Sequence, residues 1–169
     1  MTHDIKSDLV ESALELGADQ AKIFSIDDIR FDPRTLLKCL FGCRGGYHYC
    51  PTTKDVSNAA TFSEMIRRYK WGLLIRTHNL KAGQEITLAL ESRAFLAGYH
   101  FAFGATECAN CTDCTRPREL PCVDRRKLRP PLYALGIDVY STVRGLGWKI
   151  EVVQNKGDQA QNITAVFVE

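Results

Sequence analysis

Several features that would assign the chain to a familiar class of protein are missing from its sequence. The opening residues, MTHDIKSDLVESALELG, contain no apolar segment followed by a small-residue cleavage site, so we expect no signal peptide. The longest apolar runs, such as 71–75, are too short to cross a bilayer, so we expect no membrane association. Internal repeats and low-complexity segments are also absent, which argues against a solenoid or a disordered chain.

The sequence also lacks an excess of charge of either sign. Lys and Arg number 22 and Asp and Glu number 20, so the formal net charge is +2. This balance gives no global reason to expect nucleic acid or an anionic membrane as a partner. No P-loop, no glycine-rich dinucleotide motif and no nucleophile-elbow motif occurs, so we expect neither a nucleotide site nor a hydrolase triad.

Cysteine, in contrast, is frequent, with seven among 169 residues. A chain of this length can bury its own core and does not need disulfides as staples. An odd number would also leave one thiol over in any complete disulfide scheme. Without a signal peptide we expect a cytoplasmic protein, in which thiols stay reduced. We therefore interpret the cysteines as thiolate ligands of a metal.

The hydrophobic pattern alternates between helices and strands. Apolar residues recur at helical spacing over 4–16 and again over 84–97. The predicted strands are 21–26, 71–78, 99–103, 148–153 and 163–168, of which the last two are expected to form a hairpin. This order predicts an α/β fold, a compact single domain over 1–169 with a mixed central sheet flanked by helices. Two cysteine-rich metal loops, at 39–51 and 104–122, are expected to join these elements.

The second cysteine group has the more informative spacing. It consists of Cys108, Cys111, Cys114 and Cys122, and its first three members are separated by gaps of two residues. Such a loop can present thiolates to three corners of an iron–sulfur cube, and ferredoxins use this run together with a fourth cysteine. Cys122 could ligate the same cluster or another one. We therefore predict a 4Fe-4S cluster here, with electron transfer to or within a redox partner protein as the function.

The first cysteine group consists of Cys39, Cys43 and Cys50 and lies in a glycine-rich segment that also contains His48. Three thiolates on a second cluster would leave one iron open to substrate, water or His48, and an open iron acts as a Lewis acid. The alternative function is therefore an enzyme that binds a small substrate at this iron. The group could also be structural or only partly ligating, so the sequence leaves open whether the protein is an enzyme.

Zinc is the alternative metal. It prefers four tetrahedral ligands, which the second group could supply alone and the first group could supply together with His48. The protein would then be a zinc-stabilised interaction module. Inert buried thiols are a further alternative. We favour iron–sulfur because the run of three closely spaced cysteines exceeds what a zinc knuckle needs.

Basic side chains crowd the second cysteine group. They are Arg116, Arg118, Arg125, Arg126, Lys127 and Arg129. Cations near a negatively charged cluster raise its reduction potential and stabilise it. The same cations could dock an anionic partner, or they could form a solvated charged face relieved by the acidic residues nearby.

The motifs described above resemble those of a known family. The matching segments are ALELGAD at 13–19, Cys50–Pro51, the run CANCTDC at 108–114, Cys122 and the GIDV segment at 136–139. Together they resemble the family of unknown function 2284, which consists of prokaryotic proteins predicted to bind metal. The resemblance covers nearly the whole chain. It implies metal binding through these cysteines and carries no established reaction.

Overall fold

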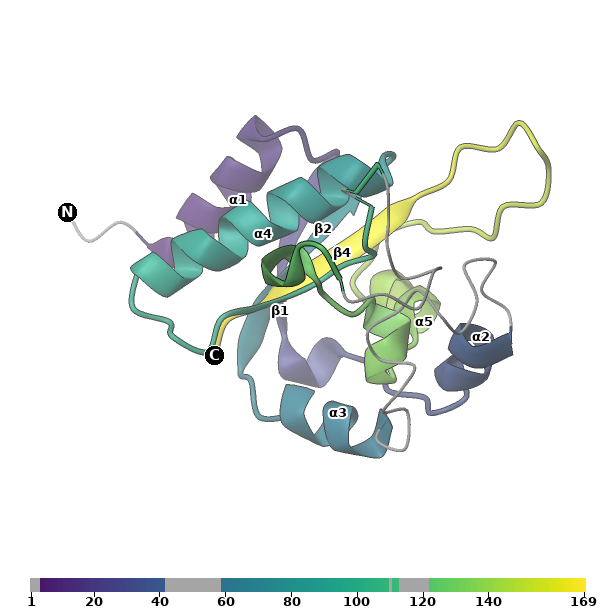
Figure 1. Ribbon diagram of the computed structural model, residues 1–169, viewed down its shortest axis with the longest axis horizontal. Helices are drawn as coiled ribbons and strands as arrows, with labels where there is room; N and C mark the ends of the chain where they lie inside the picture. Colours follow the sequence, from purple (N-terminus) through teal and green to yellow (C-terminus); the bar gives the residue numbers. More distant parts are fainter. Residues whose placement is uncertain (1–3, 42–58, 110, 113–121) are drawn as a thin grey trace.

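The computed structural model describes residues 4–41, 59–109, 111–112 and 122–169. In chain order the elements are α1 (Ile5–Glu15), β1 (Gln20–Ser25), η1 (Ile26–Asp28), α2 (Thr35–Phe41), α3 (Ala59–Ile66), β2 (Trp71–Thr77), α4 (Leu80–Leu96), β3 (Phe103–Ala105), η4 (Arg125–Lys127), η5 (Leu132–Leu135), α5 (Val139–Gly145) and β4 (Asn162–Phe167), where η marks a 3-10 helix. Figure 1 shows helices on both faces of one sheet, which confirms the α/β fold.

The sheet has the strand order β1-β2-β4-β3. All pairings between the described strands are antiparallel, so the expectation of a mixed sheet is wrong. The reason lies in the last strand. β2, α4 and β3 form a crossover between two strands that run in the same direction, but β4 is inserted between them and runs the opposite way. The alternation of helices and strands along the chain carries no signal for such an insertion.

The predicted hairpin of 148–153 with 163–168 is also wrong. Only the second segment forms a strand, β4, and both of its edges are already paired, one with β2 and the other with β3. The β-prone residues before it therefore have no edge of β4 to join, and Val152 and Val153 are exposed. The strand predicted at 99–103 is displaced to Phe103–Ala105, because Tyr99 and Ala102 form turns that follow α4.

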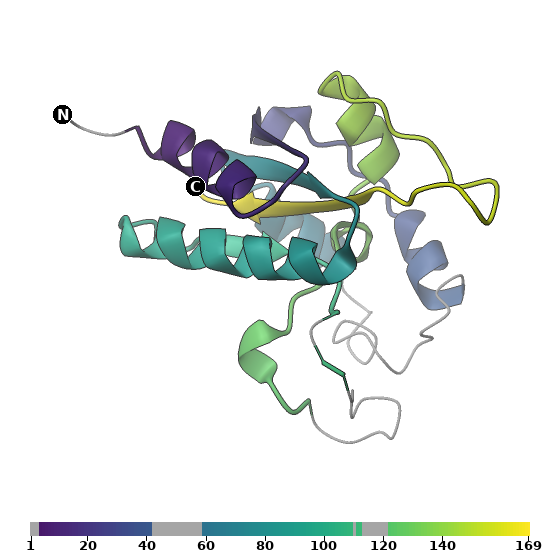
Figure 2. The same ribbon diagram turned by 90° about the horizontal axis from the view of Figure 1, so that it is seen from above.

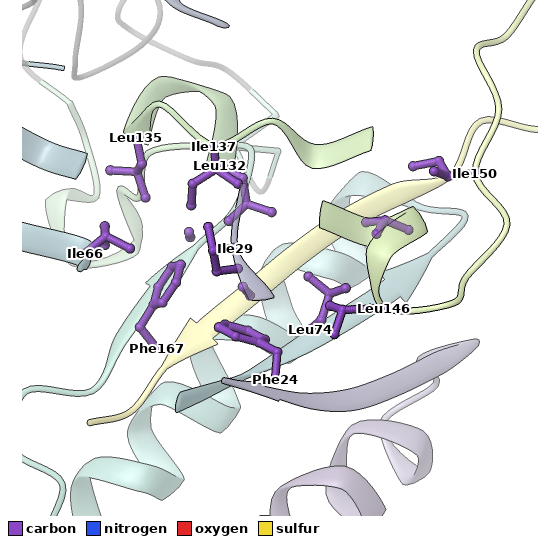
Figure 3. Close-up of a cluster of buried hydrophobic side chains, with 13 residues drawn as sticks. Phe24, Ile29, Ile66, Leu74, Leu132, Leu135, Ile137, Leu146, Ile150 and Phe167 are labelled. Carbon is purple, nitrogen blue, oxygen red and sulfur yellow. The ribbon is translucent and has the colours of Figure 1, made fainter. Parts of the chain in front are cut away.

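Two hydrophobic clusters hold the helices to the sheet. Leu73 and Ile75 of β2, with Val166 of β4, face α1 and α4. The alternate residues, such as Leu74 and Phe167, face the other side, where α3, η5 and α5 cover them (Figure 3). This alternation follows from the period of two along a strand, and it places α4 between the first face of the sheet and solvent (Figure 2). None of the described helices is both long and apolar enough to span a membrane.

Candidate metal centre

The second cysteine group begins where β3 ends. Thr77 at the end of β2 is paired with Asn162, and Ala105 at the end of β3 is paired with Ala165, so both strands end toward the start of β4. α4 follows β2 directly and begins at this edge, where the side chain of Asn79 accepts hydrogen bonds from the backbone N–H groups of Lys81 and Ala82. The first turns of α4 and the cysteine segment are therefore neighbours.

Gln84 in α4 contacts both ends of the cysteine segment. Its side chain is fully buried. The carboxamide oxygen accepts a hydrogen bond of 2.6 Å from Ala109 N, and Nε2 donates one of 2.8 Å to the carbonyl of Lys127. Nε2 also lies 3.9 Å from Sγ of Cys108, within the range of an N–H···S hydrogen bond. A backbone donor, a backbone acceptor and a thiol together fix the orientation of this amide.

Glu91, two turns further along α4, bonds the chain on both sides of the cysteine segment. We call these flanking residues, from Gly104 to Thr106 and from Arg129 to Pro130, the stem. The Glu91 carboxylate accepts hydrogen bonds from Arg129 at 2.5 and 2.8 Å and from the backbone N–H of Gly104 at 2.5 Å. The Arg129 and Glu91 side chains are each 17% exposed. The hydrogen bonds from Arg129 to Glu91 raise the pKa of Arg129, against the opposing effect of burial. A Cβ on Gly104 would lie 2.7 Å from Glu91 Oε2, so glycine permits this close approach.

A backbone hydrogen bond closes the stem. Thr106 N donates to Pro130 O at 3.0 Å, directly before and after the segment that carries the cysteines. Thr106 is buried. The described thiols beyond it are more accessible, since Cys108 is exposed and Cys111 and Cys122 are half-buried. The stem is therefore hydrogen-bonded and largely buried, and the described cysteines lie closer to the surface.

Only some of the predicted ligands lie among the residues that the structure describes. Cys39 lies within α2, and α2 packs against η5, the second element after the second cysteine group. The side chain of Cys39 and all of Cys43, His48, Cys50 and Cys114 lie outside the described residues. Within the part that is described, no three Cys, His, Asp or Glu side chains form a group that could hold a metal ion. The two ligand sets, and the metal loops at 39–51 and 104–122, therefore stay predictions.

The donor chemistry nevertheless fits a thiolate-binding metal. Cys111 and Cys122 form no disulfide with any described residue, and Cys108 has an amide donor near its sulfur. Soft sulfur ligands select iron–sulfur clusters or zinc. A hydrogen bond to a ligating sulfur is a usual feature of both kinds of site. The residues present are thus compatible with the predicted group.

The basic residues after the second cysteine group form an exposed 3-10 helix, η4. Arg125, Arg126 and Lys127 are all exposed. Asp124 lies 3.1 Å from Lys127 Nζ and 3.9 Å from Arg126 Nε, and the hydrogen bond with Lys127 lowers the pKa of Asp124. A single carboxylate thus faces two of the three cations. Arg129, by contrast, belongs to the stem, while Arg116 and Arg118 lie outside the described residues.

Glu107 precedes Cys108 and points toward η5. Tyr133 Oη donates a hydrogen bond of 3.4 Å to its carboxylate. Burial raises the pKa of Glu107, and the hydrogen bond from Tyr133 opposes that rise only in part. A half-buried carboxyl therefore lies beside the candidate ligands, on the side of the sheet opposite α4.

Sequence reasoning did not identify Gln84, Glu91 or Glu107 as site residues. A signal for the first two was present, because Gln84, Thr87 and Glu91 follow helical spacing and form a polar line along α4. Polar residues along the covered side of a helix indicate hydrogen bonding within the protein. Nothing in the sequence around Glu107 distinguishes it from a surface carboxylate.

Comparisons with known proteins agree with this chemistry at the level of the family. No curated protein and no solved structure shows a significant match to the chain. A family model described as "Predicted metal-binding protein (DUF2284)" matches residues 22–168. The match includes both cysteine groups and all four strands except the first residues of β1. The chain therefore belongs to the DUF2284 family of predicted metal-binding proteins.

Proposed function

We propose that the protein binds a 4Fe-4S cluster through Cys108, Cys111, Cys114 and Cys122 and transfers electrons to a redox partner protein. The observation that supports this proposal most is the contact of the buried Gln84 amide with Cys108 Sγ at 3.9 Å. A buried amide whose remaining capacity is used by Ala109 and Lys127 is costly to misplace, so it holds Cys108 at a defined position. A redox cluster needs its thiolate ligands held in place and hydrogen-bonded, because both affect its reduction potential. An unligated surface cysteine needs neither.

A 4Fe-4S cluster supplies a centre that accepts and releases one electron at a time. The residues around the cysteines would supply positive charge near the cluster and hold the cysteine segment in place. The N–H group of Gln84 stabilises negative charge on sulfur, and the cations of η4 act in the same direction from a greater distance. The stem formed by Glu91 and Arg129 limits movement of the segment when that charge changes.

Docking of the redox partner is assigned in this proposal to η4. Its three cations follow the second cysteine group in the sequence, and among the described residues only Arg126 and Lys127 of the three pair with a carboxylate, that of Asp124. A partner with an acidic surface would meet a complementary charge there, and the encounter would slow as salt screens it. Association with an acidic ferredoxin-type protein should weaken with rising salt. It should also weaken in the Arg125→Ala/Arg126→Ala double variant, with Arg68→Ala as the control for an exposed cation elsewhere.

The decisive experiment is anaerobic purification followed by iron, acid-labile sulfide and zinc analysis. The proposal expects a brown protein with iron and sulfide in comparable amounts. Stoichiometric zinc without sulfide would contradict the iron–sulfur assignment and support a zinc-stabilised interaction module instead.

The two cysteine groups are expected to differ in role. Replacing Cys108, Cys111 and Cys114 by Ala should remove the redox cluster. Replacing Cys39, Cys43 and Cys50 by Ala should remove only iron that responds to cyanide, because three thiolates leave one iron open to ligands such as His48 or substrate. Iron per chain and spectra with and without cyanide distinguish the variants. A single cluster that is lost in both variants would show one shared site and contradict the division.

A further inference from the structure

A pocket lies between the segment that follows β1 and the end of α3. Its volume is about 460 Å³, and the described residues that line it are Ile26, Asp27, Ile29, Arg30, Phe31 and Arg67. Ile29 is buried and belongs to the core cluster on the face of the sheet opposite α4 (Figure 3). The three charged lining residues are exposed. The pocket therefore combines apolar residues next to the core with charged side chains at the surface, which is a usual form of a small-molecule site.

The segment that lines one side of the pocket is held by its backbone. Arg30 N donates a hydrogen bond of 2.9 Å to Thr142 Oγ1, and Arg30 O accepts one of 2.8 Å from Asp138 N. Phe31 forms an isolated β-bridge with Ile137. This side of the pocket is therefore ordered before any ligand binds, which lowers the entropic cost of binding.

The guanidinium group of Arg67 is oriented by an aromatic ring. Its central carbon lies 3.9 Å from the centroid of the Phe31 ring. Stacking of this kind fixes the planar group and leaves its N–H donors, which lie in the plane, available to a ligand. Arg30 brings a second guanidinium group to the same pocket. Within the described part of the chain, neither arginine forms a salt bridge with a carboxylate.

The charge of the lining favours a ligand with a single negative charge. Asp27 is the one acidic residue among the described residues that line the pocket, and it pairs with neither arginine. Two guanidinium groups and one carboxylate leave a net charge of +1 in the lining. A monoanion would neutralise this charge, and a carboxylate group matches the fork of a guanidinium group in shape.

We propose that this pocket binds a small organic carboxylate with an apolar body. The carboxylate would accept hydrogen bonds from Arg67 and Arg30, and the apolar body would lie against Ile26 and Ile29. The proposal does not depend on which metal the cysteines bind, because none of the lining residues belongs to the cysteine groups.

The test compares two aromatic probes of the same shape on the intact protein purified with its metal. Benzoate carries a carboxylate, and benzamide replaces it with a neutral amide. In saturation-transfer difference NMR at pH 7 and low ionic strength, benzoate should bind about tenfold more tightly, because only the carboxylate forms charge-assisted hydrogen bonds with both arginines. Added salt should reduce this preference. Equal affinities, or no binding of benzoate, would overturn the proposal.

Variants separate this pocket from the metal and from the surface as a whole. Arg67→Met keeps the length of the side chain and removes the charge, so benzoate should bind about tenfold more weakly. Asp27→Asn removes the like charge and should strengthen benzoate binding about threefold. Arg68→Met is the matched control, because Arg68 is an exposed arginine next in the sequence and outside the lining. Unchanged affinity in Arg67→Met, or an equal loss in Arg68→Met, would show that benzoate binds elsewhere and would overturn the proposal.

Discussion

At the scale of single residues, Gln84 shows how one buried polar side chain can organise a surface segment. Its side-chain oxygen accepts a hydrogen bond from Ala109 N, near the start of the cysteine segment. Its Nε2 donates one to Lys127 O, after the last cysteine. The Gln84 side chain is fully buried and both hydrogen bonds are partly buried, so losing either partner would leave a buried amide group without its bond. The position of Cys108 is thereby coupled to the packing of α4.

The first prediction concerns the replacement Gln84→Leu. It should lower the free energy of unfolding by about 2–4 kcal/mol, because Ala109 N and Lys127 O would both lose a partner. Metal content per chain should fall as well, because Cys108 would no longer be positioned. Thr87→Val is the matched control on the same helix, since Thr87 is buried but bonds Gly83 and Thr164 instead of the cysteine segment. Full metal content in Gln84→Leu would show that the amide plays no part in the site.

The second prediction concerns Asp32, in the turn that leads into α2. Hydrogen bonds from the Arg34 side chain and backbone lower its pKa from 3.8 to about 2. Because the pKa is lower in the folded protein, the ionised carboxylate stabilises the fold above pH 3.8. That contribution is lost as the pH falls from 3.8 to about 2.

Asp32→Asn should therefore lower the melting temperature modestly at pH 7, and the difference from the parent should close as the pH approaches 2. The effect is small because the Arg34 side chain is 83% exposed. Arg34→Met should give a pH-dependent difference of the same direction but smaller size, because it removes the ion pair and leaves the hydrogen bond from the backbone N–H of residue 34 to Asp32. A difference that stays constant from pH 7 to pH 2 would assign the effect to packing instead.

At the scale of elements, the sequence correctly predicts the helices and strands whose hydrophobic spacing follows directly from the face that they bury. The helix at 4–16 and the strand at 71–78 correspond to α1 and β2, because one face or the whole segment is buried in the core. The segment 148–153 has equally β-prone residues, yet it forms no strand. Whether it could form a hairpin strand depends on a free edge of the neighbouring strand β4, and both edges of β4 are taken by strands distant in the sequence.

The same distinction applies to the candidate site. Cysteine spacing predicts the kind of ligand, because spacing within one loop is a local property. The residues that hold the loop come from α4, far away in the sequence, and they are Gln84 and Glu91. Their role depends on β3 lying next to α4, which no local pattern reveals.

The third prediction tests how α4 holds the stem. Arg129→Met should lower the free energy of unfolding by about 2–4 kcal/mol, because it leaves the largely buried carboxylate of Glu91 without its cation. Arg93→Met is the matched control, because Arg93 also pairs with a carboxylate and lies on α4, the helix that carries Glu91. Arg93 pairs with Asp8 but is 52% exposed, so its loss should cost less than about 1 kcal/mol. Equal costs, measured by urea unfolding, would indicate that the stem pair behaves like an ordinary surface pair.

At the scale of the whole molecule, the second cysteine group lies between two parts of one hydrophobic core. Ala105 of β3 precedes it, Leu132 of η5 follows it, and both belong to the cluster on the face opposite α4. A metal that joins the thiols also shortens the effective loop between these core residues. Metal binding and folding should therefore be coupled.

The fourth prediction follows from this coupling. Cys111→Ala should lower the thermal midpoint as well as the metal content, when compared with the metal-loaded parent. Val123→Ala is the matched control, because Val123 is exposed, belongs to the same segment and carries no thiol. Equal midpoints for Cys111→Ala and the parent would separate metal binding from stability.

The position of β4 also sets an order of events during protein synthesis. β3 has three residues and pairs only with β4 among the described strands, and β4 lies at 162–167, after every cysteine. On the ribosome, all seven thiols are therefore translated before the strand that anchors the stem of the second group. A nascent chain arrested before Asn162 should lose its bound metal to a chelator far faster than one arrested after additional linker has brought β4 out of the exit tunnel. Equal retention would show that the thiols capture their metal without the sheet. Otherwise, delivery of the metal has to wait until translation has passed β4.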